Sequence, residues 1–551
     1  MNPARRLLVA AALVAAPALL APGAAAAQGE HGHAGAPPER LGRVVFPVSC
    51  TPKARPLFVR GVALLHSFWY EEAGAAFRQV VAADSTCAMG YWGQAMSALH
   101  LLWEPPTLET AASALEAAEQ AVRLTRPDTR ERDYAEAIAT FYRGYTPAAF
   151  AARIAAYEHA MAAFARHHAW DEEGRIFYAL ALIAEGQLAA RDTTYAFQRR
   201  AVAILEPLFR IHPDHPGLAH YLIHACDSPA LAARAINAAE RYARIAPSVP
   251  HAQHMPSHIF TRVGRWDASI ASNLRAAAAA GEYERSHHLA GVWPEHAHAF
   301  DYLVYAYLQE GRDREAGALV DSTDAAPDAS APEALGYDYA RAAIPARYAL
   351  ERGRWADAEE LSVHPAPAWP GTEALTRFAR ALGAARAGDL VVARAEVDTL
   401  GQLEAALART GGPQTYWSMQ VRIQREAAAA WLARATGDTA GALQESRAAA
   451  DLDDATEKHP VTPGALLPAR ELYGEMLLEL SRPQDARRAF EAALARQPNR
   501  ARSLFGAARA AAAAGDSAGA RAFYRRYERL MAHADGDRPE LAAAREALAA
   551  R

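Results

Sequence analysis

The sequence predicts an all-α protein built as a long array of helical hairpins. Apolar residues recur every three to four positions through most of the chain, while the strict alternation typical of a strand is absent. A small residue also follows a turn residue at a spacing of five, at Gly264/Ser269, Gly311/Ala316, Gly353/Ala358, Gly388/Ala393, Gly437/Ala442, Ser481/Ala486 and Gly515/Ala520. Each pair predicts a tight turn between two helices, with a small residue where the second helix crosses the first closely.

The composition limits the classes of function. The chain has 551 residues, 51% of them hydrophobic, so it is long enough to bury a large core. Its formal net charge of -5 is small for this length, and we therefore expect no nucleic acid and no anionic membrane surface as a partner.

The first 27 residues have the pattern of a secretory signal peptide. Arg5 and Arg6 precede an apolar run over 7–20, and Ala25 and Ala27 precede the expected cleavage point. A membrane anchor is the weaker alternative, because the apolar run is short and contains a proline. We expect a periplasmic or secreted protein with no transmembrane segment after cleavage.

The next stretch, 28–53, is polar and rich in glycine and proline, and it predicts a flexible N-terminal arm. Three cysteines follow the signal peptide. In an oxidising compartment Cys50 and Cys87 could form a disulfide. Cys226 would then be either a small buried filler or a soft metal ligand.

The hairpins resemble tetratricopeptide repeats. The clearest copy spans 467–500 and has the spacing of the family at Gly474, Leu477, Ala486, Phe490, Ala493 and Pro498. A second copy opens the array with Gly61, Leu64, Ala73 and Phe77. The resemblance implies a right-handed superhelical solenoid whose first helices line a concave face.

The repeats divide the chain into three parts. We expect N-terminal hairpins over 54–210, histidine-rich central hairpins over 211–320, and C-terminal repeats over 321–551. Residues 104–190 keep helical periodicity without a clean repeat signature, and the loops 321–336 and 364–373 look inserted.

Histidine is concentrated in the central part. Eleven of the 21 histidines are found there, at His212, His215, His220, His224, His251, His254, His258, His287, His288, His296 and His298. Residues four apart on a helix share a face, so His220/His224 and His254/His258 are two pairs that could each hold one ion. Imidazoles at this spacing suit zinc, copper, nickel or iron.

The repeat register adds further candidates. We take the three central units to begin near Pro216, near Pro250 and at the helix of His298. Counted from these starting points, the second, fifth and ninth positions of the units carry mostly histidine. In the family these places face the concave groove and contact ligand. The predicted metal ligands, for zinc or another transition metal, are His220, His224, His251, His254, His258, His298 and Asp301.

Other interpretations of these residues remain open. A histidine facing a groove is more often a hydrogen-bonded lining residue than a ligand. Pro256, between His254 and His258, predicts a kink or a late helix start there. Arg262 and Tyr305 are candidate groove residues for an anionic ligand, and Asp227 is a helix cap or an orienting partner of His224.

Two functions from different classes fit these observations. One is an exported tetratricopeptide-type scaffold that binds a peptide, a protein or a small ligand in its groove and carries a transition-metal site. The other is a metal-dependent hydrolase or oxidoreductase with an open metal position. A hydrolase would need a general base, for which Asp227, Glu295 and Asp301 are the nearby carboxylates. The sequence names neither the ligand nor a reaction.

Overall fold

The structure is a computed structural model that describes residues 39–326, 328–331, 334–363 and 369–550. The chain from residue 40 onward forms one compact unit, which contains all of the elements discussed below. Within the described residues every regular element is a helix, and one isolated β-bridge pairs Val292 with Ala329. The predicted signal peptide lies outside the described residues.

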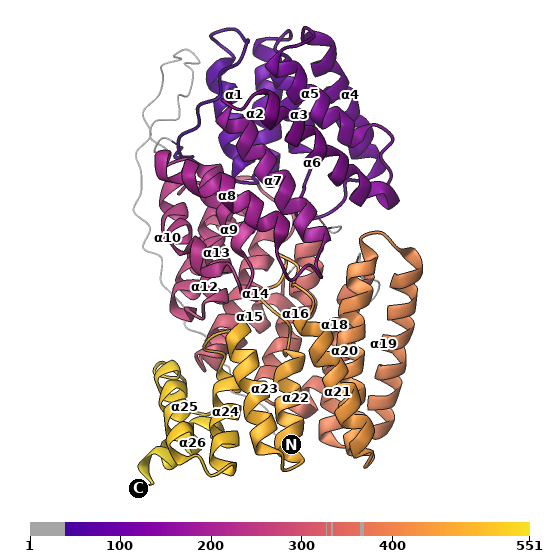
Figure 1. The fold of residues 1–551 in the computed structure, drawn as a ribbon, viewed down its shortest axis with the longest axis vertical. Coiled ribbons are helices and arrows are strands. Elements are labelled where there is room, and N and C mark those ends of the chain that lie inside the picture. Colours follow the sequence, from indigo (N-terminus) through magenta and orange to yellow (C-terminus); the bar gives the residue numbers. More distant parts are fainter. Residues whose placement is uncertain (1–38, 327, 332–333, 364–368, 551) are drawn as a thin grey trace, which may run out of the picture. The chain divides into compact units, whose positions relative to one another are not determined.

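The N-terminal hairpins are helical throughout, including the stretch 104–190 that lacks a repeat signature (Figure 1). The helices are α1 (Arg55–His66), α2 (Tyr70–Ala83), α3 (Ala88–Ser97), α4 (Leu108–Leu124), α5 (Arg130–Tyr142), η1 (Pro147–Ala149), α6 (Phe150–His167), α7 (Glu172–Leu188) and α8 (Ala196–Ile211).

The central helices follow along the chain. They are α9 (Pro216–Cys226), η2 (Ala232–Ala235), α10 (Ile236–Ile245), α11 (Pro250–His254), α12 (Pro256–Arg262), α13 (Trp266–Ser286), α14 (Pro294–Gln309) and α15 (Asp313–Asp324). A proline opens α9, α11, α12 and α14, a position where its missing N–H costs no helical hydrogen bond. The break predicted at Pro256 is present, since α11 ends at His254 and α12 begins at Pro256.

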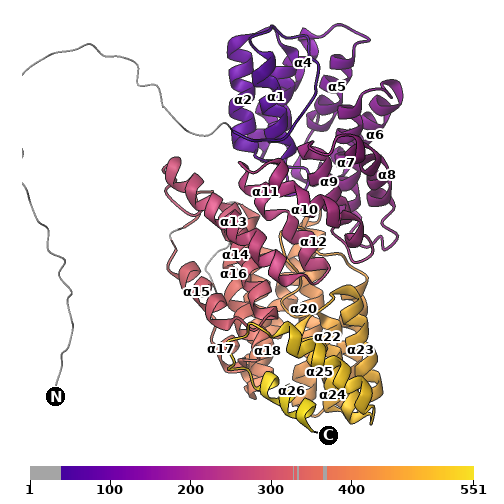
Figure 2. The same cartoon turned by 90° about the vertical axis from the view of Figure 1, so that its left-hand side faces the viewer.

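The C-terminal part continues the array (Figure 2). Its helices are α16 (Leu335–Glu351), α17 (Trp355–Glu359), α18 (Pro370–Ala387), α19 (Leu390–Thr410), α20 (Gln414–Ala435), α21 (Thr439–Asp454), α22 (Ala469–Glu479), α23 (Pro483–Arg496), α24 (Ala501–Ala513), α25 (Ser517–Leu530) and α26 (Pro539–Ala549). None of the described helices is long and apolar enough to span a lipid bilayer.

The predicted turns account for this architecture. The turn residues all have positive φ, at Gly264 (+67°), Gly311 (+69°), Gly353 (+64°), Gly388 (+99°), Gly437 (+88°), Ser481 (+56°) and Gly515 (+81°). The small residues five positions later are all buried, at Ser269, Ala316, Ala358, Ala393, Ala442, Ala486 and Ala520. Glycine adopts positive φ without steric cost, and a small side chain lets the two helices approach closely. The predicted all-α solenoid of helical hairpins is therefore confirmed.

The two clearest repeat copies share one packing contact. A Cβ atom on Gly474 would lie 2.9 Å from the ring of Phe490, and one on Gly61 would lie 2.8 Å from the ring of Phe77. In both copies the glycine of the first helix makes room for an aromatic ring of the second. The two copies therefore share this packing contact as well as their sequence pattern.

Residues 40–53, within the stretch expected to be a flexible arm, pack against the N-terminal helices. Phe46 is buried, and its ring centroid lies 5.2 Å from that of Phe58. Cys50 forms the predicted disulfide with Cys87. Cys226 is free and buried, burial raises the pKa of its thiol to about 12, and it belongs to none of the groups of potential metal ligands among the described residues, which favours the small buried filler of the two alternatives.

Candidate metal centre

Six of the seven predicted metal ligands come together as two groups of three histidines. We call His220, His224 and His251 the first triad, and His254, His258 and His298 the second triad. Within each triad, ring nitrogens of the three residues lie within 4.8 Å of one another. Because metal–nitrogen bonds of about 2.0–2.1 Å place tetrahedral ligand atoms about 3.3 Å apart, small side-chain rotations would close either triad on an ion.

The triads come from the first helices of successive hairpins. His220 and His224 lie one turn apart on α9, and their ring centroids are 4.8 Å apart. The break at Met255 does not separate the next pair, since Nε2 of His254 lies 3.0 Å from Nε2 of His258. His298 on α14 completes the second triad.

The two triads are direct neighbours. The ring centroids of His224 and His258 are 6.0 Å apart, and those of His251 and His254 are 6.1 Å apart. The six imidazoles therefore form one continuous cluster, which we call the histidine cluster. All six side chains are at most 7% exposed.

Oxygen acceptors hold the Nδ1 side of four of these rings. The contacts are His220 to the backbone oxygen of His66 (2.6 Å), His251 to Glu295 (3.0 Å), His254 to Asn273 (2.6 Å) and His258 to Asp227 (2.8 Å). An acceptor at Nδ1 selects the tautomer that carries its proton there and leaves the Nε2 lone pair free. Metal-binding histidines in proteins are oriented in the same way.

The opposite side of the rings lacks partners. Nε2 of His220, His224 and His251, and both ring nitrogens of His298, have no hydrogen-bond partner among the described residues. A buried polar atom without a partner costs about 1–3 kcal/mol. The cluster is thus an expensive arrangement of polar atoms unless a ligand binds them.

Burial favours the neutral form of five of the six imidazoles. Burial lowers the pKa of His220, His224, His254 and His298 well below the usual value, and neighbouring histidines lower it further. Burial also lowers the pKa of His258 to about 4, although its contact with Asp227 acts in the opposite direction. Neutral imidazole is the form that binds metal, so no proton needs to leave at neutral pH.

Aromatic side chains enclose the cluster. Phe68, in a turn with a φ of 54° between α1 and α2, has its ring centroid 4.4–5.9 Å from those of the first triad. The Tyr302 ring is 4.8–5.2 Å from all three rings of the second triad. Trp103 lies 5.7 Å from His251 and 5.6 Å from His298, and so contacts both triads. These rings exclude water and lower the local dielectric constant.

The irregular segment between α21 and α22, residues 455–468, covers the histidine cluster, and we call it the covering segment. Lys458 contacts Asp227 at 2.8 Å, and the hydroxyl of Tyr302 donates to the backbone oxygen of Thr462 at 3.2 Å. Arg347 donates to the backbone oxygen of Ala465 at 3.0 Å. The covering segment therefore contacts side chains on the face that the repeat register assigns to a concave groove.

Asp227 orients a histidine, but not the one suggested by its position in the sequence. It follows α9 as the C-cap, and its carboxylate accepts hydrogen bonds from His258, Arg262 and Lys458, each at 2.8 Å. Burial alone would raise the pKa of Asp227, but Lys458 and Arg262 hold it well below the usual range. The partner of Asp227 is thus His258 rather than His224, and Arg262 is engaged in a buried ion pair.

The other two predicted site residues lie outside both triads. Asp301 accepts a hydrogen bond from Arg347 at 3.2 Å. Burial raises the pKa of Asp301, and the charge of Arg347 opposes that rise. Tyr305 donates to Gln497 at 3.1 Å and accepts from Arg500 at 3.0 Å.

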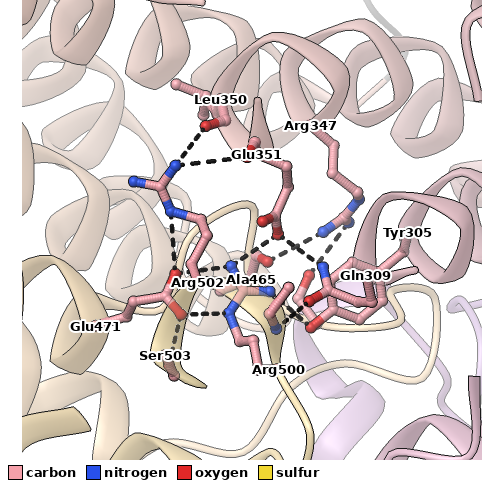
Figure 3. Close-up of polar contacts among 12 residues, drawn as sticks. Tyr305, Gln309, Arg347, Leu350, Glu351, Ala465, Glu471, Arg500, Arg502 and Ser503 are labelled. Atoms are coloured by element: carbon pink, nitrogen blue, oxygen red, sulfur yellow. Dashed lines mark hydrogen bonds and ion pairs between the residues drawn. The ribbon is translucent and has the colours of Figure 1, made fainter. Parts of the chain in front are cut away.

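These two residues border a buried network of charged side chains. Figure 3 shows the network, in which Arg500 contacts Glu351 at 2.7 Å and Glu471 at 2.9 Å. One carboxylate oxygen of Asp301 accepts from Arg347, and the other is buried without a hydrogen-bond partner among the described residues, so Asp301 stays a predicted ligand that belongs to neither triad.

A third histidine group provides an internal comparison. His66 and His215 both contact Glu173, at 2.9 Å and 3.0 Å, and the other ring nitrogen of His66 contacts the hydroxyl of Tyr221 at 3.0 Å. Nδ1 of His215 accepts from the backbone N–H of Leu218 at 3.3 Å. Every ring nitrogen of this group has a partner, so the group is complete without a ligand.

A cavity of about 970 Å³ reaches the histidine cluster. His224, Asp227 and Lys458 belong to its wall. Much of the remaining wall is apolar or aromatic, including Leu101, Leu102, Trp103, Phe150, Leu335, Trp369, Tyr416, Trp417 and Leu452. A pocket of this size and lining suits a small uncharged molecule.

Neither a protein-family model nor a curated protein sequence matches this chain. The solved structures that match include yeast Tom70, with 10% identity, a TM-score of 0.34 and coverage of 90% of this chain and 95% of that chain. The human IFIT1 dimer with PPP-AAAA matches with 11% identity, a TM-score of 0.38 and coverage of 88% and 96%. Cut9 in the APC/C hetero-tetramer Cut9-Hcn1 matches with 13% identity, a TM-score of 0.28 and coverage of 90% and 96%. These neighbours are helical repeat proteins of the tetratricopeptide type, and the likeness carries no conclusion about ligand or reaction.

Proposed function

We propose that this helical repeat protein is a metalloprotein that holds two transition-metal ions, one in each triad. The observation that carries the proposal is the difference in hydrogen bonding between the two nitrogens of the rings. Acceptors hold Nδ1 of four rings, while the first triad presents three unpartnered Nε2 atoms and His298 has no partner at either nitrogen. Six buried imidazoles with this hydrogen bonding are suited to binding ions and poorly suited to packing alone.

The fold has a definite role in this proposal. The first helices of successive hairpins face the same side of a solenoid, so α9, α11, α12 and α14 can bring their histidines together although these lie far apart in the sequence. The aromatic rings and the covering segment then remove the site from water.

Among reactions, oxidoreductase chemistry has better support than hydrolysis. A hydrolase needs a carboxylate or imidazole that is free to take a proton from water. Near the cluster, Asp227 is matched by Arg262 and Lys458, and Glu295 holds the Nδ1–H of His251. Both carboxylates already orient ligands.

A peptide or protein in the concave groove is the other candidate function. It would have to displace the covering segment, whose Lys458 and Thr462 contact the groove side chains Asp227 and Tyr302. Because these contacts are internal, the metal centre is better supported than a groove ligand.

Export to the periplasm or beyond remains part of the proposal. It depends on the signal peptide predicted over residues 1–27, and the disulfide between Cys50 and Cys87 supports it, since disulfides persist in oxidising compartments.

The test is the metal content of the untagged protein, measured by mass spectrometry after incubation with zinc or copper and desalting. We expect about two ions per chain, and about one in each of the variants His220→Leu and His298→Leu, which remove one ligand from the first and the second triad. His215→Leu, in the histidine group that is complete without a ligand, should keep two. Absence of bound metal from the wild-type protein, or an unchanged content in both triad variants, would contradict the proposal.

A further inference from the structure

The chemistry of the ligand set restricts the metal. All six donor atoms belong to imidazoles, and the nearby carboxylates Asp227 and Glu295 contact Nδ1 atoms instead of the ligand side. Hard ions such as magnesium, calcium and manganese prefer oxygen ligands, whereas imidazole suits copper, zinc, nickel and iron.

Charge favours one of these metals. Two divalent ions would add four positive charges to a site that is at most 7% exposed and contains no anionic ligand atom. Moving a charge from water into a buried site is costly, and the cost rises with the charge. Cuprous ions are monovalent, so a pair of them halves this added charge, and copper also has the highest affinity in the usual order of divalent metals.

The arrangement of the triads also restricts the ligand of the metals. Three protein nitrogens per ion leave a coordination position open. The two triads are adjacent, with the rings of His224 and His258 6.0 Å apart, and two-metal sites in proteins place their ions about 3.5–4 Å apart. The open positions can therefore be bridged by one small molecule.

The surroundings limit the size and polarity of that molecule. Phe68, Trp103 and Tyr302 lie against the triads, so a bridging molecule would be surrounded by aromatic rings. The cavity whose wall includes His224 is lined largely by apolar and aromatic side chains, beside charged ones such as Arg191, Asp192 and Glu404, and it is large enough to admit a small molecule.

We propose, on the basis of the two-ion function proposed above, that the histidine cluster holds a pair of copper ions that binds dioxygen between them. In the reduced protein each ion is cuprous. On binding, each copper loses one electron, and dioxygen takes up both, so that it is held as a dianion between two cupric ions. No proton is needed, no bond between the oxygen atoms breaks, and the two coppers are the only reductant.

The experiment uses the full-length protein, stripped of metal, loaded with cuprous copper without oxygen and then desalted. Its copper content is measured first. A content of about two per chain supports the two-ion function, and a content below one contradicts that function before dioxygen is tested. Oxygen uptake is then measured with an electrode, and we expect one dioxygen per two coppers and none for the zinc-loaded protein.

Variants distinguish a pair from two independent ions. In His220→Leu and His298→Leu the copper content should fall to about one per chain, and oxygen uptake should fall more than tenfold, because a single cuprous ion supplies only one electron. The control variant His215→Leu should match the wild-type protein. The proposal is overturned if the wild-type protein binds two coppers and takes up no dioxygen, or if the single-copper variants keep half of the uptake.

Discussion

Replacement of His298 by leucine gives a test in which stability and metal binding change in opposite directions. His298 is 1% exposed, and neither of its ring nitrogens has a partner among the described residues. Leucine is close to histidine in volume and carries no polar atom. Removing two buried unpartnered nitrogens, each costing about 1–3 kcal/mol, should stabilise the metal-free protein by about 1–3 kcal/mol after some loss of packing.

Bound metal should make the wild-type protein more stable than the His298→Leu variant. The wild-type protein gains about 2.7 kcal/mol for each site at a free metal concentration of one hundred times the dissociation constant. The variant lacks a ligand of the second triad and should gain from the first triad alone. The assay is the urea midpoint of both proteins, measured by circular dichroism with a chelator and again with added metal.

His66→Leu is the matched control. His66 is equally buried, but its nitrogens contact Tyr221 and Glu173, so its replacement leaves partners unsatisfied and should destabilise the metal-free protein by about 1–3 kcal/mol. If His298→Leu destabilised the metal-free protein as strongly as this control, the idea that His298 is maintained for a ligand would be refuted.

Three further predictions concern orientation, pH and the buried network. Asp227→Asn should weaken metal binding in the second triad about 10–100-fold, because Asp227 orients His258. A competition titration with a chromophoric chelator measures the affinity. An unchanged affinity would contradict the role assigned to Asp227. The metal-free protein should lose stability as the pH falls below about 6.5, the usual pKa of histidine in the unfolded chain. The loss should continue down to the lowered pKa values of these histidines in the folded protein, because in this range the unfolded chain binds more protons than the folded one. Each such histidine contributes about 1.4 kcal/mol per pH unit, so a urea midpoint that is constant between pH 7.5 and pH 5 would refute neutral burial. Arg500→Met should destabilise the protein by about 3–5 kcal/mol, because it removes the ion-pair partner of the buried Glu351 and leaves the buried Glu471 with Arg502, at 3.5 Å, as its ion-pair partner. Arg482→Met at the surface should cost less than about 1 kcal/mol by the same assay.

The fold could be predicted from local signals. A residue such as Gly311 marks a turn, and Ala316 marks the close crossing that follows, so each hairpin is encoded within a few residues. Spacing along a helix likewise places His220 and His224 on one face. The kink at Pro256 was also predictable, because proline removes a helical hydrogen bond.

The site itself depended on partners that lie far away in the sequence. The acceptor of His254 is Asn273, 19 residues later, and the carboxylate beside His258 is Asp227, 31 residues earlier. Helical periodicity does not specify such distances between elements. Asp301 shows the consequence, since its helical position resembles that of a ligand, yet Arg347, 46 residues later, is its partner.

The covering segment was the largest feature that the sequence analysis missed. One signal for it was present, because Lys458 is one of only two lysines in the chain and lies beside His459 in a stretch with little helical periodicity, 455–468. The repeat register treats this stretch as a connection between hairpins. In the structure it contacts Asp227 and Tyr302 on the face that the register assigns to a ligand, and it forms part of the wall of the cavity there.

The most direct test of the central claim is anomalous X-ray diffraction from crystals of the protein loaded with copper. The account predicts two anomalous peaks per chain, one among the Nε2 atoms of each triad and about 3.5–4 Å apart. A single peak, or peaks at another group such as Asp133, His167 and His168, would contradict a two-ion centre in the histidine cluster.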